Sequence, residues 1–201
     1  MDKEEQPLES STRTFDTTRG KITYAELSDL IAPKLLSLLD DINDGKYREL
    51  PFDEELILNF HKRMIGDIMP EIAGIWRKVL VGVGNWIPPE PHEVPMKIRE
   101  YVQNVQTRLQ NSDTVDLQIE TLAYAEGEFL HIHPFQDFNG RTVRIILAEL
   151  LGRFNLPPVD VYVERNTPEF KKYQNALAEY DNGRPIELIE FWQSRFSHSW
   201  K

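Results

Sequence analysis

The chain carries, at residues 133–144, the run His133-Pro134-Phe135-Gln136-Asp137-Phe138-Asn139-Gly140-Arg141-Thr142-Val143-Arg144. Apolar residues recur at helical spacing on both sides of it: Ile119, Leu122, Ala123 and Leu130 come before, and Val143, Ile146, Leu147, Leu150 and Leu151 overlap its end or follow it. The proline and the Asn-Gly pair interrupt this spacing. The run is therefore predicted to be a loop between two helices, the second of which begins near its end.

The residue types in this loop suit an anion. A helix start exposes unpaired N–H groups and the positive end of the helix dipole, and Gly140 lets the backbone come close to a ligand. Arg141 and Arg144 are three positions apart, so they share a helix face and add two positive charges. Asp137 offers a hard oxygen ligand for Mg²⁺, and His133 is a candidate proton acceptor near pH 7. The pattern indicates a nucleoside triphosphate site; the alternative is a capping turn with solvated arginines.

Most of the remaining chain is predicted to be helical, which makes the fold class all-α. Helical spacing indicates helices at about residues 23–43, with Pro33 inside, at about 53–68, and at about 94–109, 168–180 and 185–196. Asp53 is expected to cap the second of these helices, and Ser112 or Asp113 the helix that leads to the loop.

Two segments depart from the helical pattern. Val79, Val81 and Val83 alternate ahead of a Gly-Asn pair and a proline cluster, so residues 78–91 are predicted to form a short β-hairpin. Residues 1–20 are polar and are predicted to be a flexible arm without secondary structure. No internal repeat requires a second domain, so residues 21–201 are expected to form one domain.

Composition excludes several classes of function. The 201 residues include 23 Lys and Arg against 33 Asp and Glu, a net charge of −10, which argues against a nucleic-acid partner. The absence of cysteine excludes a disulfide scaffold, thiolate zinc sites and cysteine catalysis. The sequence shows no signal peptide or membrane-spanning stretch, so a cytoplasmic location and no membrane partner are expected, although an effector exported without a cleaved signal would look the same.

The run at residues 133–144 closely resembles the signature of the Fic family, HPFx(D/E)GNGRxxR. Members of that family are mainly helical and carry a β-hairpin, the flap, over the active site, often after a Gly-x-x-Arg element. Here Gly74-Ile75-Trp76-Arg77 precedes the predicted hairpin, whose flap part is residues 79–89. The resemblance covers about residues 50–155 and implies a Fic-like helical bundle with a small flap.

The resemblance also implies an activity, the transfer of AMP from ATP to a Ser, Thr or Tyr hydroxyl of a target protein with release of pyrophosphate. By position in the motif, His133 would be the general base, and Asp137 would bind Mg²⁺. Binding of the phosphates would fall to Asn139, Gly140, Arg141 and Arg144. The target protein would lie along the flap as an added strand. The alternatives are a Fic-like transfer of another phosphate-containing group and a weakly catalytic nucleotide-binding or interaction protein.

Two departures from the family pattern bear on this reading. Phe138 stands where the family usually has glycine, so the turn is expected either to have ordinary backbone dihedrals or to be reshaped. The inhibitory string (S/T)xxxE(G/N) of many relatives is absent from the sequence. Inhibition is therefore expected to come from a separate antitoxin-like protein or from self-association.

Three further residues have predicted roles. His131 is expected to be structural, and His61 is expected to be solvated or to cap a helix. Glu126 is an acidic residue on an apolar helix stripe, which predicts a buried hydrogen-bonding group.

Overall fold

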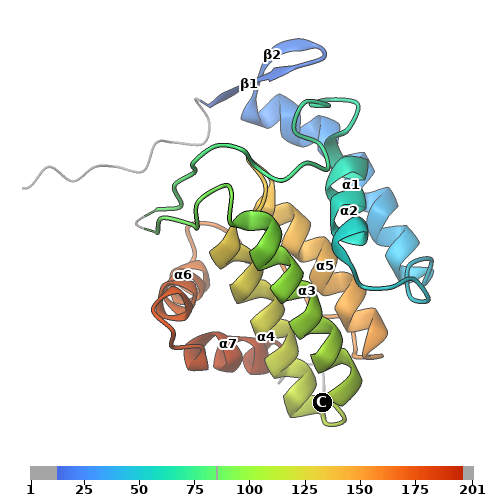
Figure 1. Cartoon of the computed structure of the whole chain (residues 1–201), viewed down its shortest axis with the longest axis vertical. Helices are drawn as coiled ribbons and strands as arrows, with labels where there is room; N and C mark the ends of the chain where they lie inside the picture. The colour runs from blue at the N-terminus through green and yellow to red at the C-terminus, as the bar shows by residue number, and fades with distance from the viewer. Residues whose placement is uncertain (1–12, 85, 197–201) are drawn as a thin grey trace, which may run out of the picture.

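The computed structural model describes residues 13–84 and 86–196, which form a helical bundle with a small N-terminal hairpin (Figure 1). The elements are, in chain order, β1 (Thr14–Thr17), β2 (Gly20–Thr23), α1 (Tyr24–Asn43), α2 (Glu54–Ile65), α3 (Val94–Asn111), α4 (Val115–Ile132), α5 (Asn139–Arg153), α6 (Pro168–Asp181) and α7 (Ile186–Phe196). The prediction of an all-α fold class is confirmed.

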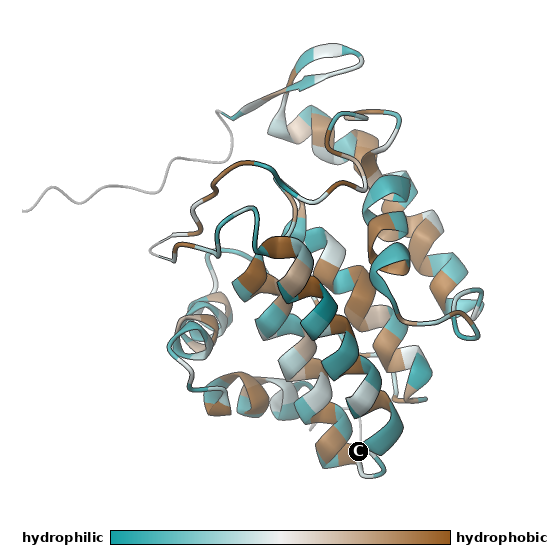
Figure 2. Cartoon of the chain, in the orientation of Figure 1, coloured by the Kyte–Doolittle hydropathy of each residue, from teal (hydrophilic) through white to brown (hydrophobic). Residues whose placement is uncertain are grey.

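The helix α4 lies at the centre of the bundle. It packs against α3, α5, α6 and α7, while α5 packs against α1 and α2 on its other side (Figure 1). The outer helices carry apolar stripes beside polar ones (Figure 2). The inner faces contribute a continuous core that includes Ile57, Phe60, Ile98, Leu122, Phe129, Ile146 and Trp192. The loop between α4 and α5 is therefore held between two rigid helices.

The helix ends follow from side-chain caps. Thr23 and Glu26 form a capping box at the start of α1, and Asp53 accepts a hydrogen bond from the backbone N–H of Leu56 at the start of α2. Both starts match the predicted ones. For α4 the predicted caps are wrong, because the residue that caps the helix is Thr114, whose hydroxyl accepts from the N–H of Leu117.

The N-terminal segment corrects the prediction of no secondary structure over residues 1–20. From Thr14 the chain forms the antiparallel pair β1–β2, and Phe15 of β1 is buried. Thr18, in the turn, donates its N–H to the carbonyl of Ile68 and its hydroxyl to that of Asp67. The hairpin is thus attached to the chain beyond α2. Residues 1–12 of the predicted arm lie outside the described residues.

The predicted β-hairpin at residues 78–91 is reduced to a single antiparallel bridge. Val83 and Trp86 exchange two backbone hydrogen bonds of 3.0 and 2.9 Å. The flanking residues have no regular secondary structure, and Leu80 and Ile87 among them are exposed. Proline cannot donate to a ladder, and Pro88 and Pro89 therefore limit the pairing.

Close approach of α6 to α4 depends on Gly127. A Cβ atom at this position would lie 2.6 Å from the ring of Tyr180. Only glycine therefore allows α6 to pack here, beside the loop at residues 133–138. None of the helices within residues 13–84 and 86–196 combines the length and hydrophobicity needed to cross a bilayer.

Candidate active site

His133 is turned out of α4 by the backbone. It follows the last residue of α4 in the left-handed conformation (φ 50°, ψ 60°), and its N–H donates to the carbonyl of Phe129. The next residue is Pro134, and a residue before proline avoids the helical region. The helix therefore ends at His133.

The ring of His133 is set up to accept a proton. Its Nδ1 lies 3.3 Å from the carbonyl oxygen of Leu130, which can only accept, so Nδ1 carries the hydrogen. The Nε2 atom of the neutral ring then has a free lone pair. Burial lowers the pKa of His133 below its ordinary value. The imidazole is accordingly neutral at pH 7 and suited to general-base chemistry.

His133 faces a cavity of about 310 Å³ together with Gly140 and Arg144. Other walls come from the flap and from the α6 region, through Trp86, Tyr162, Phe170, Tyr173 and Leu177. A charged floor with aromatic walls suits a ligand that has both an anionic and a planar apolar part.

Arg144 supplies a half-buried positive charge to this cavity. Its Nε donates to the carbonyl of Gly140 at 2.8 Å, and its guanidinium lies over the ring of Tyr162, 5.2 Å from the ring centre. Burial lowers the pKa of this guanidinium, and the nearby charge of Arg141 acts in the same direction. An anion in the cavity would relieve both effects.

Arg141 lies close to Arg144 but does not line the cavity. One of its terminal nitrogens donates to the hydroxyls of Tyr24 and Ser28 at the start of α1, at 3.2 and 2.8 Å. The other, Nη1, is buried and finds no hydrogen-bond partner among the residues that the structure describes. Such an orphaned donor is costly, so a partner for Nη1 would stabilise the protein.

Asn139 is used inside the loop. Its side-chain oxygen accepts from the N–H of Phe135 at 2.9 Å, and its side-chain nitrogen donates to the carbonyl of Phe135 at 2.8 Å. Both hydrogen-bonding ends of the amide are thus engaged. In this conformation the side chain of Asn139 is not available for the predicted phosphate contact.

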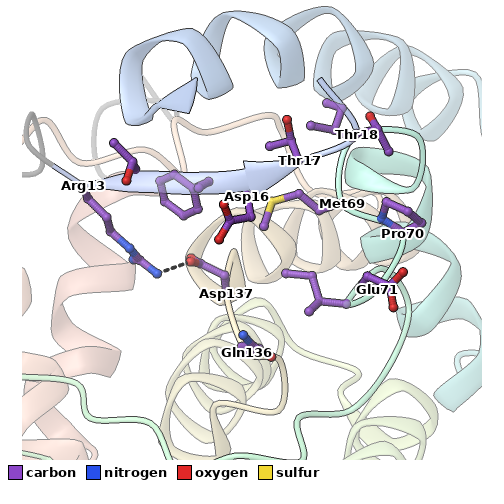
Figure 3. A pocket seen from close by; sticks show the side chains of 13 residues that line it. Arg13, Asp16, Thr17, Thr18, Met69, Pro70, Glu71, Gln136 and Asp137 are labelled. Atoms are coloured by element: carbon purple, nitrogen blue, oxygen red, sulfur yellow. Dashed lines mark hydrogen bonds and ion pairs between the residues drawn. The ribbon is translucent and has the colours of Figure 1, made fainter. Parts of the chain in front are cut away.

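Asp137 lies on a neighbouring cavity and not on that of His133. This second cavity, of about 520 Å³, lies between β1, the turn after α2 and the loop (Figure 3). The carboxylate of Asp137 forms an ion pair with Arg13 and also accepts from the N–H of Phe138 at 2.8 Å. The described residues contain no cluster of three carboxylate or histidine side chains fit for a metal. A lone carboxylate still fits Mg²⁺ that is shared with substrate phosphates, because that ion commonly uses one or two carboxylates there.

Phe138 keeps the left-handed backbone, so the expectation of ordinary dihedrals is wrong. Its φ is 62°, which costs a non-glycine residue about 1–2 kcal/mol. The ring is buried and lies 6.2 Å from that of Phe15 and 6.4 Å from that of His61. The ring packs beneath the N-terminal hairpin, and the cavity of His133 is left open.

Arg77 is a site residue whose role the sequence did not reveal. Its guanidinium donates to the carbonyls of Ile132, His133, Val79 and Pro89. One buried side chain therefore joins the end of α4 to both ends of the flap. The signal was present in the Gly74-x-x-Arg77 element, but spacing alone does not show which carbonyls the arginine contacts.

Two residues of α4 support the cavity walls. Glu126 is buried and accepts from the hydroxyl of Tyr173 and the indole N–H of Trp192, both at 2.7 Å, which confirms the predicted hydrogen-bonding role. His131 pairs with Asp181 at 2.9 Å and packs against the ring of Trp86. These contacts agree with its predicted structural role and fix the flap against α6.

His61 corrects another prediction, since it is fully buried and neither solvated nor a cap. Its ring stacks in parallel on that of Phe135, with 3.8 Å between the ring centres. It therefore packs directly beneath the loop.

Comparison with known proteins places this loop in a family. The family model for Fic/DOC proteins matches residues 51–151. The chain belongs to the Fic/DOC family. The Fic proteins of Drosophila persimilis and Drosophila melanogaster, both named protein adenylyltransferase Fic, are 34% identical over 151 residues and 32% identical over 150. Each alignment covers 75% of this chain, which spans only 28% and 29% of the length of those relatives.

Solved structures show the same Fic fold. Fic-1 from C. elegans superposes with a TM-score of 0.69 at 23% identity, over 86% of this chain and 50% of that one. The effector BepC from Bartonella tribocorum, solved with bound AMPPNP, gives 0.70 at 16% identity over 92% of both chains. The fold of the bundle is thus that of Fic proteins.

Proposed function

We propose that this chain transfers AMP from ATP to the hydroxyl of a Ser, Thr or Tyr side chain in a target protein and releases pyrophosphate. The observation that carries the proposal is the shared cavity of His133 and Arg144, which is lined by a neutral imidazole with a free Nε2 and by a half-buried guanidinium. The names of the Drosophila relatives and the AMPPNP bound to BepC support the nucleotide.

In the proposed reaction the hydroxyl oxygen bonds to the α-phosphorus while the bond from that phosphorus to the bridging oxygen of the β-phosphate breaks. Nε2 of His133 takes the hydroxyl proton, and pyrophosphate leaves with the electron pair of the broken bond. A positioned base of this kind contributes roughly 10²–10⁴-fold in rate. No covalent enzyme intermediate is required, because positioning and charge neutralisation suffice for phosphoryl chemistry.

The anionic chain of the nucleotide would meet three sources of positive charge. Arg144 lines the cavity, the buried Nη1 of Arg141 lacks a hydrogen-bond partner among the described residues, and Gly140 lies in the first turn of α5, at the positive end of the helix dipole. Asp137 would hold Mg²⁺, which when bound to the phosphates neutralises part of their charge. That role requires Arg13 to leave the carboxylate.

The target protein would bind along the flap at residues 79–89. Leu80 is 65% exposed and Ile87 76% exposed there, so apolar side chains are available to a partner. The single β-bridge leaves most backbone groups of the flap outside a ladder, as addition of a target strand requires. An antitoxin-like protein that binds in trans would be the inhibitor.

A direct test is incubation with labelled ATP, Mg²⁺ and a cell lysate, beside the variant His133→Ala. We expect protein labelling by the wild type and its loss in the variant, with ATP affinity measured by calorimetry unchanged. Equal labelling by both proteins would refute the role of His133.

The ion pair between Arg13 and Asp137 favours a second candidate, a nucleotide-binding module with weak transfer activity. Tight binding of Mg·ATP with no labelled protein in any lysate would support this candidate. A mass increase other than that of AMP on the target would instead indicate transfer of another phosphate-containing group.

A further inference from the structure

The imidazole of His61 joins two segments that are far apart in the sequence. It is placed by α2, is fully buried, and stacks on Phe135 of the loop. Its Nδ1 accepts a hydrogen bond of 2.9 Å from the N–H of Gly74, and its Nε2 lies 3.2 Å from the carbonyl oxygen of Asp137. Both contacts are with backbone groups of residues outside α2.

These contacts fix the tautomer. Because the N–H of Gly74 can only donate, Nδ1 must be unprotonated, and the hydrogen of the neutral ring is on Nε2. Nε2 therefore donates to the carbonyl of Asp137. Burial lowers the pKa of His61 to about 4, which keeps the ring neutral and able to make both hydrogen bonds at physiological pH.

The carbonyl of Asp137 belongs to the peptide that joins it to Phe138. In a trans peptide the C=O and N–H point in opposite directions. While His61 holds the C=O toward the core, the N–H of Phe138 points away from it, and there it donates to the carboxylate of Asp137 at 2.8 Å. The orientation of this peptide thus sets the position of the carboxylate.

The same peptide determines the conformation of Phe138. Its positive φ of 62° is unfavourable for an aromatic residue. A flip of the peptide would give a negative φ and remove this strain, but it would break the hydrogen bond to His61 and the one to the carboxylate. The local preference of Phe138 and the hydrogen bond from His61 therefore oppose each other.

We propose that His61 is a positioning residue of the active site: its hydrogen bond to the carbonyl of Asp137 prevents the flip of the Asp137–Phe138 peptide and so keeps the carboxylate in place for Mg²⁺. This proposal rests on the proposed function only for the role of Mg²⁺. The orientation of the peptide is a separate, structural claim.

Two substitutions separate the contacts of His61. His61→Gln can place an amide nitrogen near the position of Nε2 and keep the donor to Asp137, while His61→Asn can keep only the acceptor for Gly74. The measured quantity is the factor by which Mg²⁺ strengthens ATP binding in calorimetry. We expect His61→Asn to reduce this factor about tenfold, as loss of one well-placed hydrogen bond allows, and His61→Gln to reduce it less than about threefold.

The coupling to Phe138 provides a sharper test. In the background Phe138→Gly the left-handed backbone carries no strain, so the peptide no longer gains from flipping. His61→Asn should then reduce the Mg²⁺ factor less than about threefold. The exposed His92 gives the matched control, because His92→Asn should leave the factor unchanged.

Equal losses in the Asn and Gln variants, or an undiminished loss in the Phe138→Gly background, would overturn the proposal. If His61→Asn fails to fold, His61→Phe, which keeps the ring stacked on Phe135, replaces it with the same expectation. If the wild type binds no ATP, the proposed function fails, and crystal structures of the variants decide this inference. A flipped Asp137–Phe138 peptide in His61→Asn but not in His61→Gln supports the inference. The wild-type peptide orientation in both variants overturns it.

Discussion

The guanidinium of Arg13 is paired with the carboxylate of Asp137, 124 positions later in the chain. Arg13 directly precedes β1, and Asp137 is the residue to which the proposed reaction assigns Mg²⁺. The same N-terminal region places Phe15 against Phe138, and Tyr24 and Ser28 on Arg141. Residues 13–28 therefore contact three positions of the run at residues 133–144, so the hairpin and the start of α1 border the candidate site.

Removal of Arg13 should free the carboxylate of Asp137. We expect Arg13→Ala to raise the affinity for Mg·ATP by about two- to fivefold, the size of an exposed ion pair, with little change in thermal stability. Calorimetry with and without Mg²⁺ measures the effect. Lys21→Ala is the control, since the ion pair that Lys21 forms among the described residues is with Asp16 on the same hairpin. Unchanged or weaker binding in Arg13→Ala would show that Arg13 does not compete with the metal.

Substitutions at Phe138 should show an unusual order of stability. Phe138→Ala loses a buried ring, which costs about 3–5 kcal/mol, and keeps the strained backbone. Phe138→Gly loses the same ring but relieves about 1–2 kcal/mol of strain, so the glycine variant should be the more stable of the two. Urea denaturation measures both. An alanine variant that is more stable than the glycine variant would contradict the left-handed geometry.

Stability should depend on the protonation of His61. Its pKa is about 4 in the folded chain against an ordinary value of 6.5, so the unfolded chain binds the proton more tightly. The resulting stabilisation is complete above pH 6.5 and is lost as the pH falls toward 4, on the order of 3 kcal/mol in all. His133, whose pKa burial also lowers, contributes with the same sign.

Urea denaturation at pH 7 and pH 5 measures this loss of stability. The variant His61→Gln should show a shallower loss than the wild type, and the control His92→Gln the same loss as the wild type. If the free energy of unfolding changes equally with pH in all three proteins, His61 does not cause the change.

Replacement of Arg77 by lysine should destabilise the protein. A single ammonium cannot reach the carbonyls of His133, Val79 and Pro89 together, and buried carbonyls would be left unpaired. We expect Arg77→Lys to lower the free energy of unfolding by about 2–4 kcal/mol and to expose the flap to proteolysis. Arg99→Lys, at an exposed ion pair with Glu54, should change it by less than about 0.5 kcal/mol. Equal effects of the two substitutions would contradict the role of Arg77.

The helices were predictable because their apolar spacing is long and regular. The N-terminal hairpin was not, because strands of four residues give only two alternations, and burial of Phe15 depends on Phe138, more than 100 positions later in the chain. For the flap the prediction claimed too much strand. The alternating valines are typical of a strand, but the proline cluster limits the pairing to one bridge.

Glu126 and His61 carry the same sequence signal on two different helices. Each is a polar residue on an apolar helix stripe, and both are buried and hydrogen-bonded. The stripe of α2, with Ile57 four positions before His61, could have identified the histidine as the stripe of α4 identified Glu126. The ion pair of Arg13 with Asp137, by contrast, depends on tertiary packing that no local pattern records.

The central claim is that AMP, and no other part of ATP, passes to a protein hydroxyl in the cavity of His133. The most direct measurement compares ATP labelled on the α-phosphate with ATP labelled on the γ-phosphate, each incubated with the protein, Mg²⁺ and a cell lysate. We predict labelled protein from the α-labelled nucleotide only, and none from either nucleotide with His133→Ala. Labelling from the γ-phosphate, or labelling that persists in the variant, would contradict the account.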